Sequence, residues 1–142
     1  MTIERIMEGR EQHIVSCETG MTVKEAAGLL ASRRIGAMPV YEAGRIVGIF
    51  SERDLLYSIS ERGEGALSQR VGDVMTTPAI TVAPQTEVIE ALSLMTRRRI
   101  RHLPVERGGK IVGFISIGDL VKYRIELIEA EAEQMREYIR TA

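Results

Sequence analysis

The sequence contains an internal duplication with a period of 65 residues. The segment IVGIFSERDL at 46–55 returns as IVGFISIGDL at 111–120, and sixteen of the 34 positions from 22 to 55 are identical 65 residues later. A unit of about 60 residues buries too small a fraction of its surface to be very stable alone. We therefore expect two similar units that pack face to face about a pseudo-twofold axis.

Each copy predicts the same order of elements, namely strand, helix, strand, strand and helix. Short β-prone runs at 13–17 and 79–83 come first, and apolar residues at helical spacing follow at 22–34 and 87–99. Two strands joined by a Gly-containing turn come next. Pro39 and Pro104 stand near the start of the first of these strands, where a missing N–H is tolerated. A second helix begins after Ser51 and Ser116, so the predicted fold class is α+β, of an α/β type.

The duplication also predicts how the chain is divided. We assign residues 1–62 to the first unit, the polar and Gly-bearing residues 63–72 to a linker, and residues 73–124 to the second unit. Residues 125–142 form a helical extension that has no counterpart in the first unit.

Apolar residues continue along this extension at intervals of 4, 3, 4, 3 and 4, which is the heptad spacing of a coiled-coil seam. They are Val121, Ile125, Ile128, Ala132, Met135 and Ile139. A helix of this length needs another surface to cover its seam. We favour a second subunit, and the alternative is that the helix folds back over its own module.

Three motifs, in this order, resemble the CBS domain, and the last two of them occur in both copies. They are DVMTTPAITV before the second unit, a strand carrying RI-x-x-M-PV or RI-x-x-L-PV, and a strand-to-helix junction that ends in S-x-x-D-L. The resemblance extends from about residue 14 to residue 123 and includes both copies, as in a stand-alone CBS pair. It implies a non-catalytic regulatory module that binds adenine nucleotides and forms a homodimer.

The S-x-x-D at 51–54 and 116–119 has two compatible interpretations. Ser51 and Ser116 can cap the second helix of each unit, with Asp54 and Asp119 completing a capping box. A helix N-terminus at the end of a buried strand also offers N–H groups and a positive dipole to an anion. In CBS domains that resemble this one, the Ser contacts ligand and the Asp holds the ribose of an adenine nucleotide.

The resemblance extends to further candidate ligand contacts, which we expected to come from the same unit as the junction. They lie on the first strand of each unit, beside the junction, or just before the proline: Ile14, Val15, Arg53, Ala37, Met38, Ile80, Thr81, Arg101, His102 and Leu103. Arg101 and His102 would favour phosphate in the second cleft. Gly36 and Ala37 would leave room for a larger ligand, such as a dinucleotide, in the first.

The resemblance leaves the ligand and the client open. AMP is the expected nucleotide, with ATP, ADP, NAD(H) and S-adenosyl compounds as alternatives that share an adenosine, and no metal is required. Two other functions stay open: a degenerate CBS pair that acts as a dimerisation scaffold, and a sensing accessory subunit of a separate, unknown enzyme. The Ser and Asp retained in both copies argue against the scaffold.

Charge and composition disfavour several other functions. The net charge is −1, which gives no general attraction to nucleic acid, and the basic run MTRRRIRH at 95–102 has no interleaved aromatic residues for base stacking. There is no apolar run of 18 residues or more, so no membrane partner is expected. One cysteine and no signal-like N-terminus favour a cytoplasmic location. His13 and His102 are far apart and no nucleophile stands beside a base, which predicts neither a metal cluster nor catalysis.

Overall fold

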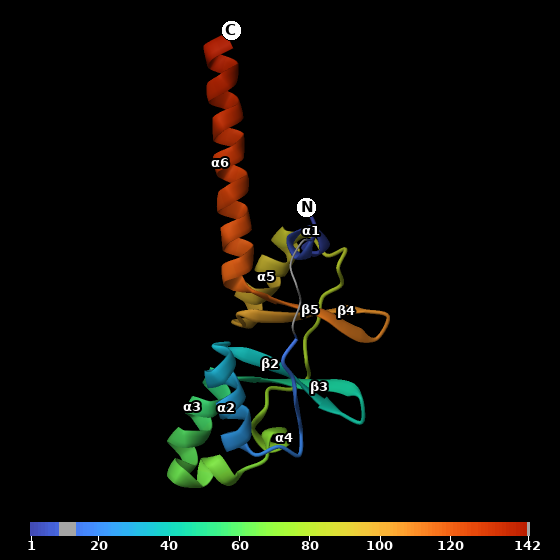
Figure 1. Cartoon of the computed structure of the whole chain (residues 1–142), viewed down its shortest axis with the longest axis vertical. Coiled ribbons are helices and arrows are strands. Elements are labelled where there is room, and N and C mark those ends of the chain that lie inside the picture. Colours follow the sequence, from blue (N-terminus) through green and yellow to red (C-terminus); the bar gives the residue numbers. More distant parts are fainter. Residues whose placement is uncertain (9–13, 142) are drawn as a thin grey trace.

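Each copy of the duplicated sequence folds into the same arrangement of helices and strands. The structure is a computed structural model that describes residues 1–8 and 14–141. The elements of the first unit are β1 (Cys17–Glu18), α2 (Val23–Arg33), β2 (Ala37–Glu42), β3 (Arg45–Ser51) and α3 (Glu52–Arg62). Those of the second are α5 (Val88–Arg98), β4 (His102–Arg107), β5 (Lys110–Ser116) and α6 (Ile117–Thr141). Figure 1 shows the two units stacked with their β-hairpins facing each other, and the predicted α+β class is confirmed.

The strands pair in the same register in both units. β2 lies between β1 and β3 in the first sheet, while β4 and β5 form the second sheet. The hairpins share a register shift at equivalent positions, between Val40 and Tyr41 and between Val105 and Glu106. β1 pairs with β2 only from Val40 onward, one residue after Pro39, so the proline N costs this ladder no hydrogen bond. The strand expected at 79–83 is reduced to a parallel bridge between Val82 and Val105.

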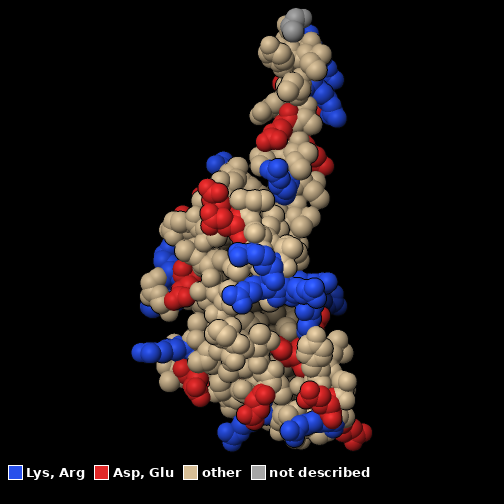
Figure 2. Space-filling view, turned by 180° about the vertical axis from the view of Figure 1, so that it is seen from behind, with Lys and Arg blue, Asp and Glu red and all other residues tan. Residues whose placement is uncertain are grey.

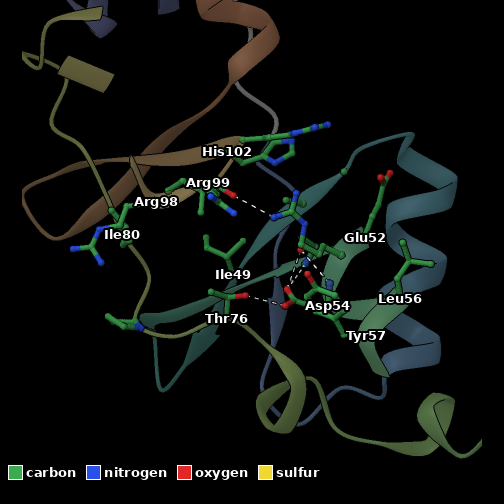
Figure 3. A pocket seen from close by; sticks show the side chains of 17 residues that line it. Ile49, Glu52, Asp54, Leu56, Tyr57, Thr76, Ile80, Arg98, Arg99 and His102 are labelled. Atoms are coloured by element: carbon green, nitrogen blue, oxygen red, sulfur yellow. Dashed lines mark hydrogen bonds between the residues drawn. The ribbon is translucent and has the colours of Figure 1, made fainter. Parts of the chain in front are cut away.

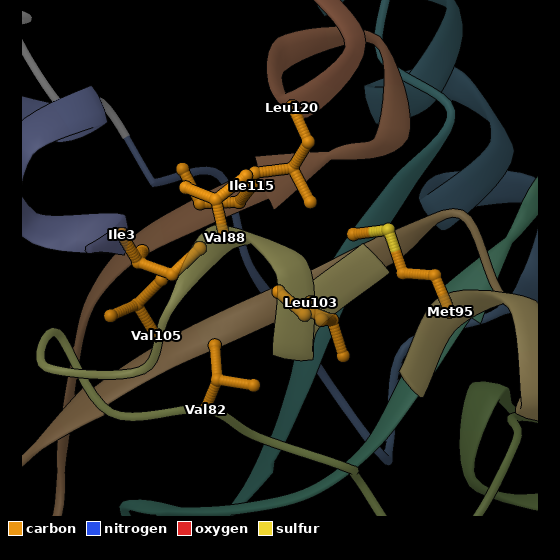
Figure 4. Close-up of a cluster of buried hydrophobic side chains, with 9 residues drawn as sticks. Ile3, Val82, Val88, Met95, Leu103, Val105, Ile115 and Leu120 are labelled. Carbon is orange, nitrogen blue, oxygen red and sulfur yellow. The ribbon is translucent and has the colours of Figure 1, made fainter. Parts of the chain in front are cut away.

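A cluster of buried apolar side chains lies between the helices and the sheet of each unit. In the first unit it contains Cys17, Val23, Ala26, Leu30, Met38, Val40, Phe50 and Val71. In the second it contains Ile3, Val82, Val88, Ala91, Met95, Leu103, Val105, Ile115 and Leu120 (Figure 4). Val23, Ala26 and Leu30 of the first and Val88, Ala91 and Met95 of the second occupy equivalent turns of α2 and α5, so the predicted helical faces are the ones that become buried.

The N-terminal residues pack against the second unit, whereas the sequence assigned residues 1–62 to the first. Ile3, in α1 (Ile3–Met7), is fully buried in the second cluster. The Ile3 N–H donates to the Thr86 carbonyl at 2.9 Å, and the Val88 N–H donates to the Met1 carbonyl at 2.9 Å. These bonds attach α1 to the start of α5. The duplication could not predict this, because residues 1–8 lie outside the repeated segment.

The segment assigned to a linker, 63–72, completes the first unit. It forms the 3-10 helix η1 (Gly63–Ser68) and leads into α4 (Val71–Val74). Ala66 and Val71 are fully buried, and the Val71 N–H donates to the Met21 carbonyl at 2.8 Å. Ala66 and Val71 stand among polar residues, so composition indicated a solvated segment, although both side chains are buried and Val71 belongs to the first core.

Helix α6 continues for 25 residues, and Figure 1 shows it extending away from both units. The alternative in which the C-terminal extension folds back over its own module is therefore wrong. Within residues 1–8 and 14–141, no helix combines the length and the apolar character that crossing a membrane would need.

The packing of α1 makes a testable prediction. Ile3→Ala should lower the free energy of unfolding by about 2–5 kcal/mol, because it leaves a cavity in the second core. Ile89→Ala is the matched control, since Ile89 is 66% exposed on α5 and its loss should change stability by less than about 1 kcal/mol. Urea unfolding followed by circular dichroism measures both changes. Equal values for the two variants would show that α1 does not belong to the second core.

Candidate ligand-binding cleft between the two units

Both S-x-x-D junctions form the predicted helix caps. At the start of α3, the Asp54 N–H donates to Ser51 Oγ at 3.3 Å, and the Ser51 N–H donates to Asp54 Oδ2 at 2.9 Å. At the start of α6, the Asp119 N–H donates to Ser116 Oγ at 3.1 Å, and the Ser116 N–H donates to Asp119 Oδ2 at 2.9 Å. The capping box therefore fixes each carboxylate at the strand-to-helix turn.

Asp54 is held from three sides and is nearly buried. Besides the cap, Ser51 Oγ donates to Oδ2 at 3.0 Å and Thr76 Oγ1 donates to Oδ1 at 2.8 Å. The exposed fraction of Asp54 is 8%. Because each carboxylate oxygen can accept more than one hydrogen bond, Asp54 retains capacity for a ligand hydroxyl. Thr76 was not among the sequence candidates, since nothing in TTP at 76–78 distinguishes it from a turn residue.

A glycine allows the Thr76 segment to reach this carboxylate. Residues 75 and 76 cross β3, where the Thr76 N–H donates to the Ile49 carbonyl at 2.9 Å and receives a bond in return at 3.0 Å. A Cβ on Gly48 would lie 2.7 Å from both Met75 Sδ and the Thr76 carbonyl oxygen. Gly48 is therefore required for the close approach that brings Thr76 to Asp54.

A pocket of about 480 Å³ opens beside this carboxylate and is lined by both units. Its volume is in the range of small-molecule sites. The lining residues are Gly36, Ala37, Ile49, Ser51, Glu52, Arg53, Asp54, Leu56, Tyr57, Thr76, Pro78, Ile80, Arg98, Arg99, Ile100, Arg101 and His102 (Figure 3). The prediction that each cleft is lined by residues of a single unit is wrong for this pocket. The C-terminal end of α5 and the start of β4, both in the second unit, line it together with the junction of the first unit.

The charge of the lining favours an anion. Four arginines among the described residues (Arg53, Arg98, Arg99 and Arg101) line the pocket together with the carboxylates of Glu52 and Asp54. Arg53 Nη1 donates to the Arg99 carbonyl at 3.2 Å and so connects α3 to the C-terminal end of α5. Figure 2 shows basic side chains gathered across the middle of the molecule, at the level where the units meet. Guanidinium groups bind phosphate oxygens in a bidentate manner, so this side of the pocket suits a phosphate.

Part of the lining is apolar. Ile49, Pro78 and Ile80 contribute aliphatic surface to the lining, and Ile80 is one of the ligand contacts that the sequence predicted. Figure 3 shows Ile49 beside Thr76. A flat heterocycle can bury its faces against such side chains while its polar edge remains near solvent or backbone. The pocket thus joins an apolar wall, a carboxylate and a set of guanidinium groups.

His102 fills the space opposite Gly36. Its ring stacks on Phe114, with centroids 5.7 Å apart and an interplanar angle of 12°. A Cβ on Gly36 would lie 3.3 Å from His102 Cε1, so the small residue in one unit accommodates the ring from the other. This corrects the expectation that Gly36 leaves room for a larger ligand in a separate first cleft, because His102 occupies that space.

The ionisation of His102 is shifted by the same packing. Burial lowers the pKa of His102, and Arg101 adds to this effect, while the negative charges of Glu52 and Asp119 oppose it. The imidazole is therefore neutral at pH 7 and can either donate or accept a hydrogen bond.

Comparison with protein families identifies the fold. A family model described as CBS domain matches residues 4–61 and 71–126. The chain belongs to the CBS domain family.

Known CBS proteins resemble the chain along most of its length. A mitochondrial CBS domain-containing protein of Arabidopsis thaliana is 38% identical over 128 residues, which cover 87% of this chain and 62% of that relative. A CBS-domain containing protein from Agrobacterium tumefaciens has a TM-score of 0.84 and 34% identity, over 87% of this chain and 99% of that one. A CBS domain protein from Pyrobaculum aerophilum, solved in complex with AMP, has a TM-score of 0.77 and 29% identity, over 93% and 99% of the two chains. The chain thus spans less than two thirds of the Arabidopsis relative.

The structure of this CBS pair brings half of the sequence-derived candidates into the pocket. These are Ala37, Ser51, Arg53, Asp54, Ile80, Arg101 and His102. Arg101 and His102 were assigned to the second cleft with Ser116 and Asp119, but here they line the pocket that contains Ser51 and Asp54. Ile49, Thr76, Arg98 and Arg99 also line it and were missed. The two arginines belong to the basic run at 95–102, which was considered only as a nucleic-acid patch.

The other candidates lie elsewhere. Met38 and Leu103 are fully buried in the two cores, where β2 and β4 point them away from the cleft. The Thr81 hydroxyl donates to Glu106 Oε2 at 3.0 Å. Ile14 and Val15 are half-buried, and Val15 packs against the first core. Ser116 and Asp119 form the second junction and do not line this pocket.

The described part of the CBS pair gives no support to metal or thiol chemistry. Among residues 1–8 and 14–141, no three His, Cys, Asp or Glu side chains are grouped as metal ligands. Burial raises the pKa of the Cys17 thiol to about 11, and its sulfur lies 3.8 Å from the Pro39 carbonyl oxygen. Cys17 is therefore a protonated core residue at neutral pH.

The shifted pKa of His102 predicts a pH dependence of stability. Its pKa in the folded chain is lower than the ordinary value of about 6.5. As the pH falls below about 6.5, the unfolded chain binds a proton before the folded chain does, so the free energy of unfolding decreases. The decrease should be smaller in His102→Gln. Urea unfolding of both proteins at about pH 7.5 and about pH 5.5 measures the decrease in the free energy of unfolding. The contribution of His13 is present in both proteins and cancels in the comparison. Identical decreases would show that His102 is protonated equally well in the folded state.

The close approach at Gly48 predicts a contrast between two glycines. Gly48→Ala should lower the melting temperature, because its Cβ would meet the Thr76 backbone and Met75, and overpacking costs about 1–3 kcal/mol. Gly28→Ala should raise it by removing a glycine from the interior of α2, where no atom lies within 4 Å of the new Cβ. Equal melting temperatures for Gly48→Ala and the unmodified protein would contradict the described crossing of residues 75 and 76 over β3.

Proposed function

We propose that this CBS pair is a non-catalytic regulatory module that binds an adenine nucleotide in the cleft shared by its units. The observation that carries the proposal is that one pocket combines the capped Asp54 carboxylate, an apolar wall and four arginines among its described lining residues. These groups match the ribose, the base and the phosphate of a nucleotide. The AMP complex of the Pyrobaculum aerophilum relative, at 29% identity, supports the same ligand class.

Each part of the nucleotide has a candidate partner. The ribose hydroxyls would donate to Asp54, which already accepts bonds from Ser51 and Thr76 and is held rigidly. The base would lie against Ile49, Pro78 and Ile80. The phosphate would accept hydrogen bonds from the arginines at the end of α5 and from Arg53. The second junction, at Ser116 and Asp119, repeats the capped carboxylate, and we propose it as the ribose acceptor of a second cleft.

We propose AMP as the ligand, since the arginines and Asp54 suffice for one phosphate and one ribose, with ADP, ATP and NAD(H) as competitors in the same assay. The regulatory effect would be a population shift. Because the cleft is lined by both units, a bound nucleotide favours the arrangement of the units in which Asp54 and Arg101 both reach it. No metal takes part in this proposal.

The proposal includes a homodimer that acts on a separate client protein. The client and the cytoplasmic location expected from the sequence stay predictions. A dimerisation scaffold without ligand is the competing function, and the retained pocket chemistry argues against it. A sensing subunit of a separate enzyme would use the same cleft.

The phosphate contact can be separated from the ribose contact by mutation. Arg101→Ala should weaken the binding of AMP by roughly ten- to hundredfold and leave the binding of adenosine almost unchanged, because a charge-assisted hydrogen bond is worth about 1.5–3 kcal/mol. Asp54→Ala should weaken the binding of AMP and of adenosine alike, because both ligands carry the ribose. Isothermal titration calorimetry with both ligands on each variant measures these changes.

Asp54 also caps α3, so its variant needs a control for stability. Thr22→Ala removes a comparable cap from α2, where the Thr22 side chain accepts from the Glu25 N–H at 3.1 Å outside the pocket. It should reduce the melting temperature while keeping AMP binding. Equal losses of affinity for AMP and for adenosine in Arg101→Ala would reject the phosphate contact. If the unmodified protein binds none of AMP, ADP, ATP and NAD(H), the scaffold function is favoured.

A further inference from the structure

Helix α6 carries an apolar seam that its own module does not cover. At about 1.5 Å per residue, its 25 residues reach roughly 37 Å. The exposed fraction is 44% for Val121, 51% for Ile125, 49% for Ile128, 61% for Met135 and 68% for Ile139. Ala132, which completes the seam, is also exposed. The heptad seam predicted from the sequence therefore lies open over the whole length of the helix.

A different face of the same helix contacts the module. Leu120 is fully buried in the second core, Tyr123 packs against that core, and Leu127 is half-buried. These three residues are spaced by 3 and 4 positions, so they form one stripe along the helix. None of them is a seam residue. The contact with α1 and α5 thus uses one stripe of α6 and leaves the seam stripe free for another molecule.

We propose that the seam packs against α6 of a second copy of this chain in a parallel, in-register, two-stranded coiled coil. The proposal deepens the proposed homodimer and does not depend on nucleotide binding. In this arrangement Val121, Ile128 and Met135 occupy d positions, and Ile125, Ala132 and Ile139 occupy a positions.

The charges beside the seam support the parallel orientation. Arg124 and Glu131 stand at g positions, while Glu129 and Arg136 stand at e positions. In a parallel coiled coil each g residue faces the e residue five positions later in the partner. Arg124 then faces Glu129 of the partner subunit, and Glu131 faces Arg136 of the partner subunit. Both contacts join opposite charges, and the symmetry of the dimer forms each of them twice.

The antiparallel alternative with full overlap places like charges together. Glu129 would face Glu129 of the partner subunit, Glu131 would face its own counterpart, and Lys122 would face Arg136 of the partner subunit. Sliding the antiparallel helices by one heptad restores opposite charges but leaves two seam residues at one end without an apolar partner. The parallel arrangement alone among these satisfies both the charges and the apolar positions.

A cysteine near the end of the seam tests the orientation. In the parallel dimer, Ile139→Cys brings the two thiols into disulfide range, so oxidation should convert most of the full-length protein to a covalent dimer. In the fully overlapping antiparallel dimer, Ile139 would face Val121 of the partner subunit, so the two thiols would lie roughly 27 Å apart. Glu137→Cys, on the face opposite the seam, is the matched control and should remain mostly uncrosslinked. The unmodified chain controls for the buried Cys17.

A charge exchange tests the register. Arg124→Glu should weaken the dimer by roughly three- to thirtyfold in sedimentation velocity, because two symmetric contacts become repulsive. Adding Glu129→Arg should restore the dimer. Within one helix, residues five positions apart do not face each other, so the rescue can act only between chains. All of these side chains are exposed, and circular dichroism should show unchanged folding.

The outcomes separate this interface from the broader proposal. A dimer that persists without the Ile139→Cys crosslink and without charge rescue would overturn the coiled coil and keep the homodimer. A chain that is monomeric at all concentrations would overturn both, and a trimer or larger assembly would overturn the two-stranded form. AMP binding is measured separately and decides the nucleotide proposal by itself.

Discussion

The capping box at the start of α3 is the interaction on which the candidate site depends. It fixes Asp54 at the end of a buried strand, so that one carboxylate oxygen closes the helix cap while the other accepts from Thr76. Thr76 lies in the segment that leaves the first unit for the second, so the same carboxylate also holds the start of that segment. A single carboxylate therefore serves folding and, in our proposal, ligand recognition, which is possible because its oxygens accept several hydrogen bonds.

Segments that lie outside the duplication contribute to both cores. Residues 1–7 complete the core of the second unit, and residues 63–74 complete the core of the first. Each unit alone would be small and would lack part of its buried surface. A ligand that holds the cleft together would act on both units at once, which is the physical basis for a regulatory response by population shift.

Two positions at which the copies diverge lie where the units meet. Gly36 in one copy and Arg101 in the other occupy equivalent positions, as do Ala37 and His102. The structure shows that Gly36 leaves the space that the His102 ring fills, and that Arg101 reaches the same pocket as Asp54. The two copies therefore contribute complementary residues to one cleft in this region, and the small residue at position 36 has a steric reason.

The sequence by itself determined the duplicated units, the order of their elements, the capped S-x-x-D junctions and the heptad seam of α6. These features depend on contacts between residues close together in the chain, such as Ser51 with Asp54, or on a periodicity that is visible in the residues themselves. The tertiary structure decided which residues share the cleft, the position of Thr76, and the packing of α1 in the second core. Contacts such as Arg53 with Arg99, or Ile3 with the second core, join positions far apart in the chain. They depend on how the two units face each other, and no local propensity or spacing carries that information.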